Sequence, residues 1–254
     1  SRRYTCVAAF GSLGDCPRPR RVLLLVKAYH IADAAAELAQ YGLDYLPLLS
    51  LQNGIGHGEL LSARLPQSRL CIGVTYLAAR LIAPGHAEAT GLGRTAIAPY
   101  NGLPLTEAEQ WAALLNAAGC PAQAQPEVAR LQWQKLAVNA VINPLTALLN
   151  LDNGSLPDWP EFSPRREKLV GETTAVARAE GVPLDSAYVA EQVRRTCTAT
   201  ASNHSSMLSD MEQGRRTEIE AINGMICRLG AAHGVATPEH CRLYREVRAR
   251  EQGG

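Results

Sequence analysis

The sequence has no excess of charge of either sign and no hydrophobic run long enough to cross a membrane. Its 25 Lys and Arg residues nearly balance 24 Asp and Glu residues, for a formal net charge of +1, so no basic field favours a nucleic-acid partner. The longest apolar runs, such as residues 22–26, are too short for a bilayer, and no hydrophobic stretch follows the arginine-rich beginning. We therefore expect no membrane span, no signal peptide and a cytoplasmic protein.

Paired cysteines are also lacking, because the seven cysteines are odd in number and scattered, with no CxxC motif and no short histidine spacing. A disulfide framework needs pairs, and a structural zinc site needs closely spaced ligands. The pattern therefore predicts reduced thiols and no metal site. The cysteines are Cys6, Cys16, Cys71, Cys120, Cys197, Cys227 and Cys241.

The first 21 residues lack the glycine loop with which a dinucleotide-binding domain normally begins. In such a domain a strand leads into GxGxxG at the start of a helix, whose N–H groups receive the pyrophosphate. The nearest approach is GSLG at residues 11–14, but no strand of credible length precedes it, and Pro17 and Pro19 stop any helix after it. We therefore expect no phosphate-binding loop here.

The amino-terminal half has the pattern of strands alternating with helices. Solid apolar runs at 22–26, 46–51 and 70–75 predict strands of a parallel sheet that is buried on both faces, and residues 32–38 have helical character. Between residues 81 and 98, short alternating pieces containing three glycines predict an antiparallel edge or a hairpin. An apolar share of 46% is ample for a hydrophobic core.

The carboxyl-terminal half shows helical patterns and no strand pattern, so two domains are expected. Thr106 with Glu109 has the spacing of a capping box, and Ser163 with Pro164 predicts the start of another helix. Further helices are expected at 131–150, 186–200, after residue 214 and from 237 onward. We place the boundary in a segment rich in Gly and Pro, which gives an α/β domain at 1–120 and an all-helical domain at 121–254.

The most unusual stretch is residues 131–150, where Lys135, Asn139 and Asn143 recur every four residues along an apolar helix. Unpaired burial would cost about 1–3 kcal/mol for each amide and more for the ammonium, so these groups need partners or a ligand. One interpretation is that they tie down neighbouring loops. We favour a site. Pro144 is expected to end or kink the helix just after the stripe.

Two polar residues follow predicted strands. Lys27 and Asn53 lie at or just past strand ends, where ligands collect in parallel α/β sheets, and Gly54 with Gly56 would allow a ligand close to the backbone. The same spacing is equally typical of an ordinary Asn-Gly turn. His57 is expected to be a loop histidine without a catalytic role.

A second polar stretch extends from residue 203 to residue 218. Glu218 begins a predicted helix and could pair with Lys135, although an acidic residue at a helix start is also favoured by the helix dipole alone. Ser205 and Ser206 fit helix caps better than ligands, and Arg215 belongs to a solvated face. Spacing alone leaves the role of Glu218 open.

These segments together resemble the ketopantoate reductase family, the NADPH-dependent enzymes of pantothenate synthesis. The resemblance rests on KLAVNAVINPLTALLN at 135–150, NHSSMLSDMEQGRRTEIEAINGMI at 203–226 and LQNGIG at 51–56, and it extends from about residue 23 onward. It implies a Rossmann-type NADP-binding domain followed by an all-helical substrate domain, with the active site in the cleft between them. It also implies a small 2-oxo acid as substrate and allows a homodimer.

The resemblance also implies roles for individual residues. Lys135 matches the family's general acid, which protonates the carbonyl oxygen as hydride arrives from NADPH, and Glu218 matches the glutamate that supports it. Asn139, Asn143, Asn203 and Ser206 match residues that hold the substrate, and Lys27 and Asn53 match cofactor positions.

The sequence departs from the family at its beginning, because the family starts with a strand, GxGxxG and an arginine for the 2′-phosphate. Two explanations are open: a shortened form of a working enzyme, which we favour, or a relative that has lost cofactor binding and acts as a binding or dimerisation module. Without the first βαβ unit, a sheet edge and apolar surface would be exposed.

Overall fold

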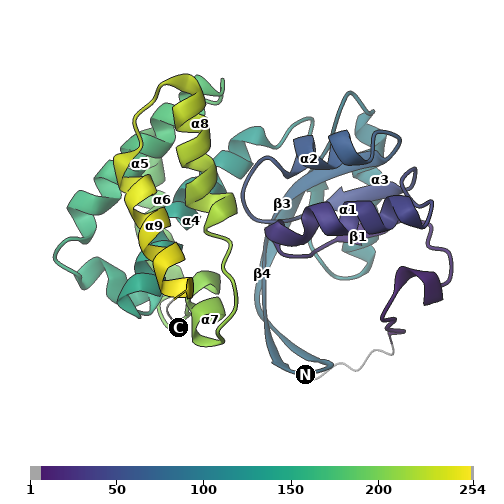
Figure 1. Ribbon diagram of the computed structural model, residues 1–254, viewed down its shortest axis with the longest axis horizontal. Coiled ribbons are helices and arrows are strands. Elements are labelled where there is room, and N and C mark those ends of the chain that lie inside the picture. Colours follow the sequence, from purple (N-terminus) through teal and green to yellow (C-terminus); the bar gives the residue numbers. More distant parts are fainter. Residues whose placement is uncertain (1–6, 253–254) are drawn as a thin grey trace.

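The computed structural model describes residues 7–252, which form a sheet-containing half and a helical half lying side by side (Figure 1). We call them the sheet half, residues 22–124, and the helical half, residues 129–252. Cys6 and the other residues before position 7 lie outside the described range. Among the described residues, no helix combines the length and the apolar character that crossing a membrane requires.

The sheet half contains five strands in the order β1-β2-β3-β4-β5. β1 (Val22–Leu24), β2 (Pro47–Ser50) and β3 (Arg69–Ala83) are parallel, β3 and β4 (His86–Pro99) form an antiparallel hairpin, and β5 (Ala122–Ala124) pairs parallel to β4. The predicted parallel strands and hairpin are thus confirmed. β5 falls just past the boundary that we placed at residue 120.

Both faces of the sheet are covered, which explains the solid apolar runs in the sequence. On one face, Leu48 packs in a core with α1 (Ile31–Gln40) and α2 (His57–Arg64). On the other face, the adjacent Leu49 packs with Trp111 of α3 (Leu105–Ala117). β1 is the edge strand of the described sheet, and Leu23 and Leu25 beside that edge are 41% and 63% exposed.

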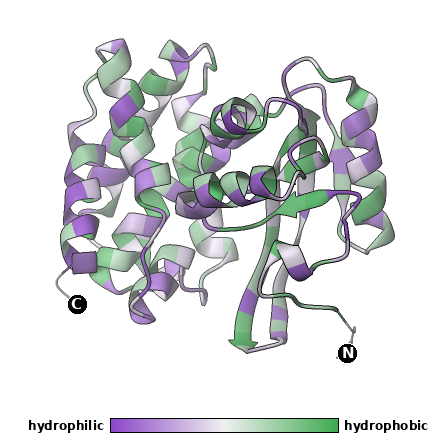
Figure 2. Cartoon of the chain, turned by 45° about the vertical axis from the view of Figure 1, so that its right-hand side comes forward, coloured by the Kyte–Doolittle hydropathy of each residue, from purple (hydrophilic) through white to green (hydrophobic). Residues whose placement is uncertain are grey.

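The helical half is built around α4 (Ala129–Leu149). Around it pack α5 (Phe162–Ala179), α6 (Ser186–Ala199), α7 (Ser206–Glu212), α8 (Met225–His233) and α9 (Pro238–Gln252), with short helical turns at Asn153–Asp158 and Glu220–Gly224. Figure 2 shows hydrophilic and hydrophobic residues alternating along these helices, as expected when each helix buries one side.

Two predicted helix starts are wrong. α3 begins at Leu105, after Pro104 and without a side-chain cap, so Thr106 is no cap, and Glu107 instead anchors this turn by pairing with Arg69 of β3. α5 begins before Ser163, because Phe162 is 2% exposed in the helical core and extends the helix backward. In both cases a tertiary contact decided the boundary.

The sequence predicted that Pro144 either ends or kinks the helix. An end is wrong, since α4 continues to Leu149, next to the expected limit at residue 150. Pro144 has no N–H to donate to the carbonyl of Ala140, and the side chain of Asn223 donates to that carbonyl instead, at 3.0 Å. Asn223 comes from the π-helical turn Glu220–Gly224, which replaces the predicted continuous helix after residue 214. A residue 83 positions away along the chain therefore supplies the hydrogen bond that Pro144 cannot donate.

The cysteines and His57 were also assigned a state or a place from the sequence. The six cysteines within residues 7–252 are free thiols, in line with the predicted reduced state. His57 is no loop residue, because it opens α2 and is 4% exposed.

Candidate active site

The candidate site lies where the carboxyl ends of β1 and β2 meet the helical half. The segments after these strands carry Lys27 and Asn53, α4 contributes Lys135, and Glu218 precedes the π-helical turn. The four side chains come from distant parts of the sequence and are linked by hydrogen bonds or short chains of contacts across the two halves.

Lys135 reaches from α4 into the sheet half. Its ammonium donates to the side-chain oxygen of Asn53 at 2.8 Å and to the backbone carbonyl of Thr75 at 2.7 Å. Burial lowers the pKa of Lys135 to about 8, while the carboxylate of Glu218 acts in the opposite direction. A lysine with this pKa releases its proton more easily than an ordinary lysine.

Glu218 is 6% exposed. Hydrogen-bond donors contact its carboxylate, so a helix dipole is not its only stabilisation. One carboxylate oxygen accepts from the backbone N–H of Ala28 at 2.9 Å, and the other accepts from the amide of Asn53 at 3.2 Å. Asn53 therefore uses its oxygen for Lys135 and its nitrogen for Glu218. Sequence reasoning raised a direct pairing of Lys135 with Glu218; in the structure the Asn53 amide stands between them.

The loop of Asn53 is fixed by close backbone contact. Gly54 has a φ of +89°, and a Cβ atom there would lie 2.5 Å from the carbonyl oxygen of Ala221. Only glycine tolerates this approach and this backbone angle. The loop can therefore touch the helical half at the point that brings Asn53 between Lys135 and Glu218.

A buried polar chain that the sequence did not reveal runs beneath this loop. The hydroxyl of Ser50 lies 2.7 Å from Nδ1 of His57, and Nε2 of His57 lies 3.2 Å from the amide nitrogen of Gln132, one helical turn before Lys135. Gln52 in turn donates to the carbonyl of Leu24 at 2.8 Å. Burial lowers the pKa of His57 to about 4, so the imidazole is neutral near pH 7 and braces the loop without carrying charge.

Lys27 makes a different contact across the two halves. Its ammonium lies 2.5 Å from a carboxylate oxygen of Asp210 in α7, and Arg215 donates to the other oxygen at 2.8 Å. Asp210 is 1% exposed, so the two cations supply the partners that this buried charge needs. Sequence analysis singled out Lys27 but missed Asp210, since no periodic pattern marks it.

The predicted substrate residues are spread along the helical half. Asn143 is 7% exposed on α4 and Asn139 is half-buried, and no hydrogen-bond partner for either side chain is found within residues 7–252. Asn203 and Ser206 are exposed at the start of α7. The neighbouring Ser205 caps that helix by accepting from the N–H of Leu208, as the sequence predicted.

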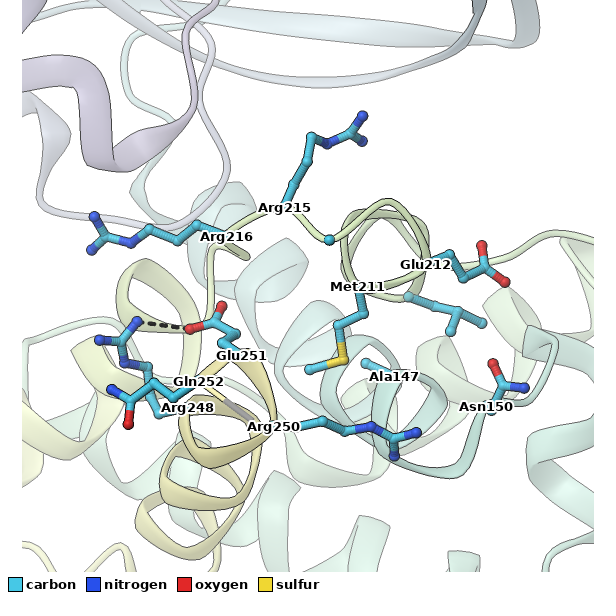
Figure 3. Close-up of a pocket in the computed structure, with 12 residues that line it drawn as sticks. Ala147, Asn150, Met211, Glu212, Arg215, Arg216, Arg248, Arg250, Glu251 and Gln252 are labelled. Atoms are coloured by element: carbon cyan, nitrogen blue, oxygen red, sulfur yellow. Dashed lines mark hydrogen bonds and ion pairs between the residues drawn. The ribbon is translucent and has the colours of Figure 1, made fainter. Parts of the chain in front are cut away.

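The larger cavities lie away from Lys135. One of about 460 Å³ lies between the ends of α4, α7 and α9, where the arginines of the lining point in different directions and Arg248 pairs with Glu251 (Figure 3). Another, of about 470 Å³, is lined by apolar side chains including Trp133 and Met225. A much smaller cavity, of about 10 Å³, is bordered by Lys135, Asn53 and Gln132. Residues 7–252 contain no cluster of three or more side chains that could hold a metal ion.

Comparison with known proteins gives the family. Residues 12–102 match the model described as ketopantoate reductase PanE/ApbA, and residues 127–251 match the model of its C-terminal part. The 2-dehydropantoate 2-reductase of Vibrio cholerae is 35% identical over 231 residues, which is 91% of this chain and 77% of the relative.

Solved structures agree in fold. A D-mandelate dehydrogenase in complex with NADH and anilino(oxo)acetate superposes with a TM-score of 0.87 at 26% identity, over 92% of this chain and 77% of that one. A PanE/ApbA family ketopantoate reductase from Ralstonia eutropha has a TM-score of 0.83 at 32% identity, over 92% and 76%. The chain thus belongs to the ketopantoate reductase family of oxidoreductases, with a Rossmann-type sheet half and an all-helical half.

Proposed function

We propose that the protein reduces 2-dehydropantoate (ketopantoate) to pantoate, or reduces a closely related 2-oxo acid, with NADPH as hydride donor and Lys135 as general acid. The observation that carries the proposal is the ammonium of Lys135, held at the sheet edge by Asn53 and Thr75 with its pKa lowered to about 8. The family relationship supports the reaction class, since the matched relatives are named 2-dehydropantoate 2-reductases.

Lys135 has one proton left for the substrate. An ammonium has three N–H donors, and the oxygens of Asn53 and Thr75 occupy two of them. Hydride attack on a ketone builds negative charge on its oxygen, so the third N–H can stabilise this charge and then transfer its proton. A pKa near the working pH favours such transfer, and general acid catalysis of this kind contributes roughly 10²- to 10⁴-fold.

Glu218 and Asn53 orient the lysine and complete the proton site. The carboxylate of Glu218 favours the charged form of Lys135 before the proton is transferred. Asn53 connects the two groups and fixes the direction of the ammonium. In this proposal Lys135 is the acid and Glu218 supports it and a substrate hydroxyl.

Four polar side chains are proposed to hold the substrate. Asn139 and Asn143 present amides from α4, and Asn203 and Ser206 present polar groups at the start of α7. A 2-oxo acid carries a carboxylate, for which amide and hydroxyl donors are suitable partners. The amides of the α4 stripe have no hydrogen-bond partner within residues 7–252, which supports this assignment over a purely structural one.

Lys27 and Asn53 are proposed to hold the cofactor. Both follow strands at the carboxyl edge of the parallel sheet, the edge at which nucleotides bind in such folds. The Lys27 side chain is 34% exposed, and its ammonium and the Asn53 amide are both hydrogen-bond donors that a nicotinamide nucleotide can use. The bound cofactor would supply the hydride.

The test is the rate of NADPH oxidation with 2-dehydropantoate, measured for the wild-type protein and for Lys135→Ala. We expect kcat to fall about 100-fold or more in the variant, while Lys168→Ala, at an exposed lysine of α5, keeps the wild-type rate. Equal rates in the wild type and Lys135→Ala would refute the role of Lys135. NADH in parallel assays decides the nucleotide. No turnover, together with no heat of binding at millimolar nucleotide, would favour the non-catalytic alternative.

A further inference from the structure

Tyr76 lies directly beside the ammonium of Lys135. It follows Thr75 in β3, and the centre of its ring is 5.7 Å from Nζ of Lys135, with the ammonium over the ring. Its side chain remains 49% exposed although the neighbouring residues Thr75 and Lys135 are at least half-buried. An exposed aromatic ring next to a buried catalytic group calls for an explanation, because the proposed reaction gives it no role.

The sheet is locally distorted at this residue. Thr75 pairs with Thr95 and Leu77 pairs with Leu92, so two residues of β4 stand opposite Tyr76 alone. One of them, Gly93, lies so close to the Tyr76 backbone that a Cβ atom there would collide with it. Such bulges bend the strand and redirect a side chain, and they are common next to active sites. The bulge explains how a sheet residue comes to face Lys135.

Tyr76 has an aromatic neighbour from the helical half. Tyr188 of α6 is 47% exposed, and a charge on its phenol raises the pKa of Tyr76, next to the larger effect of burial.

The position of a substrate bound to Nζ of Lys135 determines which of its groups the Tyr76 ring can contact. A ketone oxygen hydrogen-bonded to Nζ lies roughly 2.8 Å away, and the carbonyl carbon lies about 1.2 Å beyond it. A group attached to that carbon can then contact a ring centred 5.7 Å from Nζ. One group is the carboxylate, which the negative face of an aromatic ring disfavours and which amide donors attract. The ring therefore flanks the other group, the carbon side chain of the 2-oxo acid.

We infer that Tyr76 is a specificity-determining residue, whose ring selects 2-oxo acids that carry a branched or aryl group on the carbonyl carbon over those that carry a methyl group. The inference rests on the proposed 2-oxo acid reductase function and adds the side-chain class to it. Apolar contact with the ring stabilises a bulky group, whereas the methyl group of pyruvate covers little of the ring.

The experiment compares kcat/KM for phenylglyoxylate, 2-dehydropantoate and pyruvate in Tyr76→Ala and in the wild type. We expect Tyr76→Ala to lose roughly 10- to 100-fold on the two bulky substrates, mainly through a higher KM, and to stay within about threefold on pyruvate. Tyr76→Phe keeps the ring and should match the wild type. Equal losses on all three substrates, or no loss, would overturn the inference.

Tyr45→Ala is the matched control. Tyr45 is 44% exposed, similar to Tyr76, but it precedes β2 at the amino end of that strand, the opposite edge of the sheet from Lys135. We expect wild-type selectivity in this variant. A loss on bulky substrates here as large as in Tyr76→Ala would also contradict a specific role for Tyr76.

A binding measurement separates failure of this inference from failure of the proposed function. If the wild type turns over no 2-oxo acid with either nucleotide, the proposed function fails, and titration calorimetry with the unreactive analogue oxanilate still tests Tyr76. Binding that weakens at least tenfold in Tyr76→Ala supports the inference. Equal binding in both proteins, or none in the wild type at millimolar oxanilate, overturns it.

Discussion

The two lysines that join the halves of the molecule have opposite surroundings. Lys135 extends from the helical half, and its hydrogen bonds within residues 7–252 go to neutral oxygens, those of Asn53 and Thr75. Lys27 extends from the sheet half and meets the buried carboxylate of Asp210. A neutral, desolvated setting makes the proton of Lys135 easier to release, whereas direct pairing with a carboxylate makes Lys27 a cross-link. The same residue type is thus suited to proton transfer at one contact and to holding the two halves together at the other.

The largest effect is expected from breaking the contact of Lys27. Asp210→Ala removes the shared partner of Lys27 and Arg215, and should lower the free energy of unfolding by about 2–4 kcal/mol, because the network spans both halves and Asp210 is 1% exposed. Urea denaturation measures this. Glu88→Ala, which breaks the exposed Arg80–Glu88 pair of the hairpin, should leave the midpoint unchanged. Similar midpoints in both variants would show that the buried Asp210 contributes no more to stability than the exposed Arg80–Glu88 pair.

Replacing Lys27 or Lys135 by methionine should change the free energy of unfolding in opposite directions. Lys27→Met leaves Asp210 with Arg215 as its one remaining cation and should cost about 1–2 kcal/mol of unfolding free energy, a value reduced because Lys27 is one-third exposed. Lys135→Met removes a desolvated charge and should stabilise the protein by about 1 kcal/mol while it abolishes activity.

Chemical denaturation of Lys27→Met and Lys135→Met at pH 7 measures the two free energies of unfolding against that of the wild type. Lys168→Met, at the exposed lysine, is the control and should stay within about 0.5 kcal/mol of the wild type. Loss of stability in Lys135→Met would mean that its hydrogen bonds outweigh the desolvation that lowers its pKa.

The sequence predicted the members of the Lys135 site better than their connections. Lys135, Asn53 and Glu218 were each recognised, by helical register, by position after a strand and by resemblance. Their linkage through the Asn53 amide depends on contacts that span 82 and 165 residues, which no local pattern encodes. Asp210 was missed for the same reason, and His57 was wrongly expected in a loop because its burial depends on tertiary packing.

The fold was predictable where burial leaves a local pattern. Solid apolar runs identified the parallel strands, and β2 and β3 are covered on both faces. The predicted start of α5 was wrong because core packing of Phe162 extends the helix backward. An end of α4 at Pro144 was wrong because Asn223 donates to the carbonyl of Ala140. Local rules describe the preference of a segment, and tertiary contacts overrode it at these positions.

The smallest expected effect concerns the pH dependence of Lys135 itself. The general acid that we propose, Lys135, must be protonated to act, so kcat should fall as the pH rises through the lysine pKa of about 8. The charge of Glu218 raises that pKa against the larger lowering by burial, and Glu218→Gln removes the charge while it keeps a side chain of similar shape. The alkaline limb of the kcat profile should therefore move to lower pH in Glu218→Gln.

Asp210→Asn serves as the control for this shift, because Asp210 contacts Lys27 instead of Lys135. Its alkaline limb should coincide with that of the wild type, even where its rate is lower. An unchanged limb in Glu218→Gln would mean that the proton in question does not reside on Lys135. An equal shift in both variants would mean that the two lysines share one electrostatic environment, contrary to the separate partners that each has in the structure.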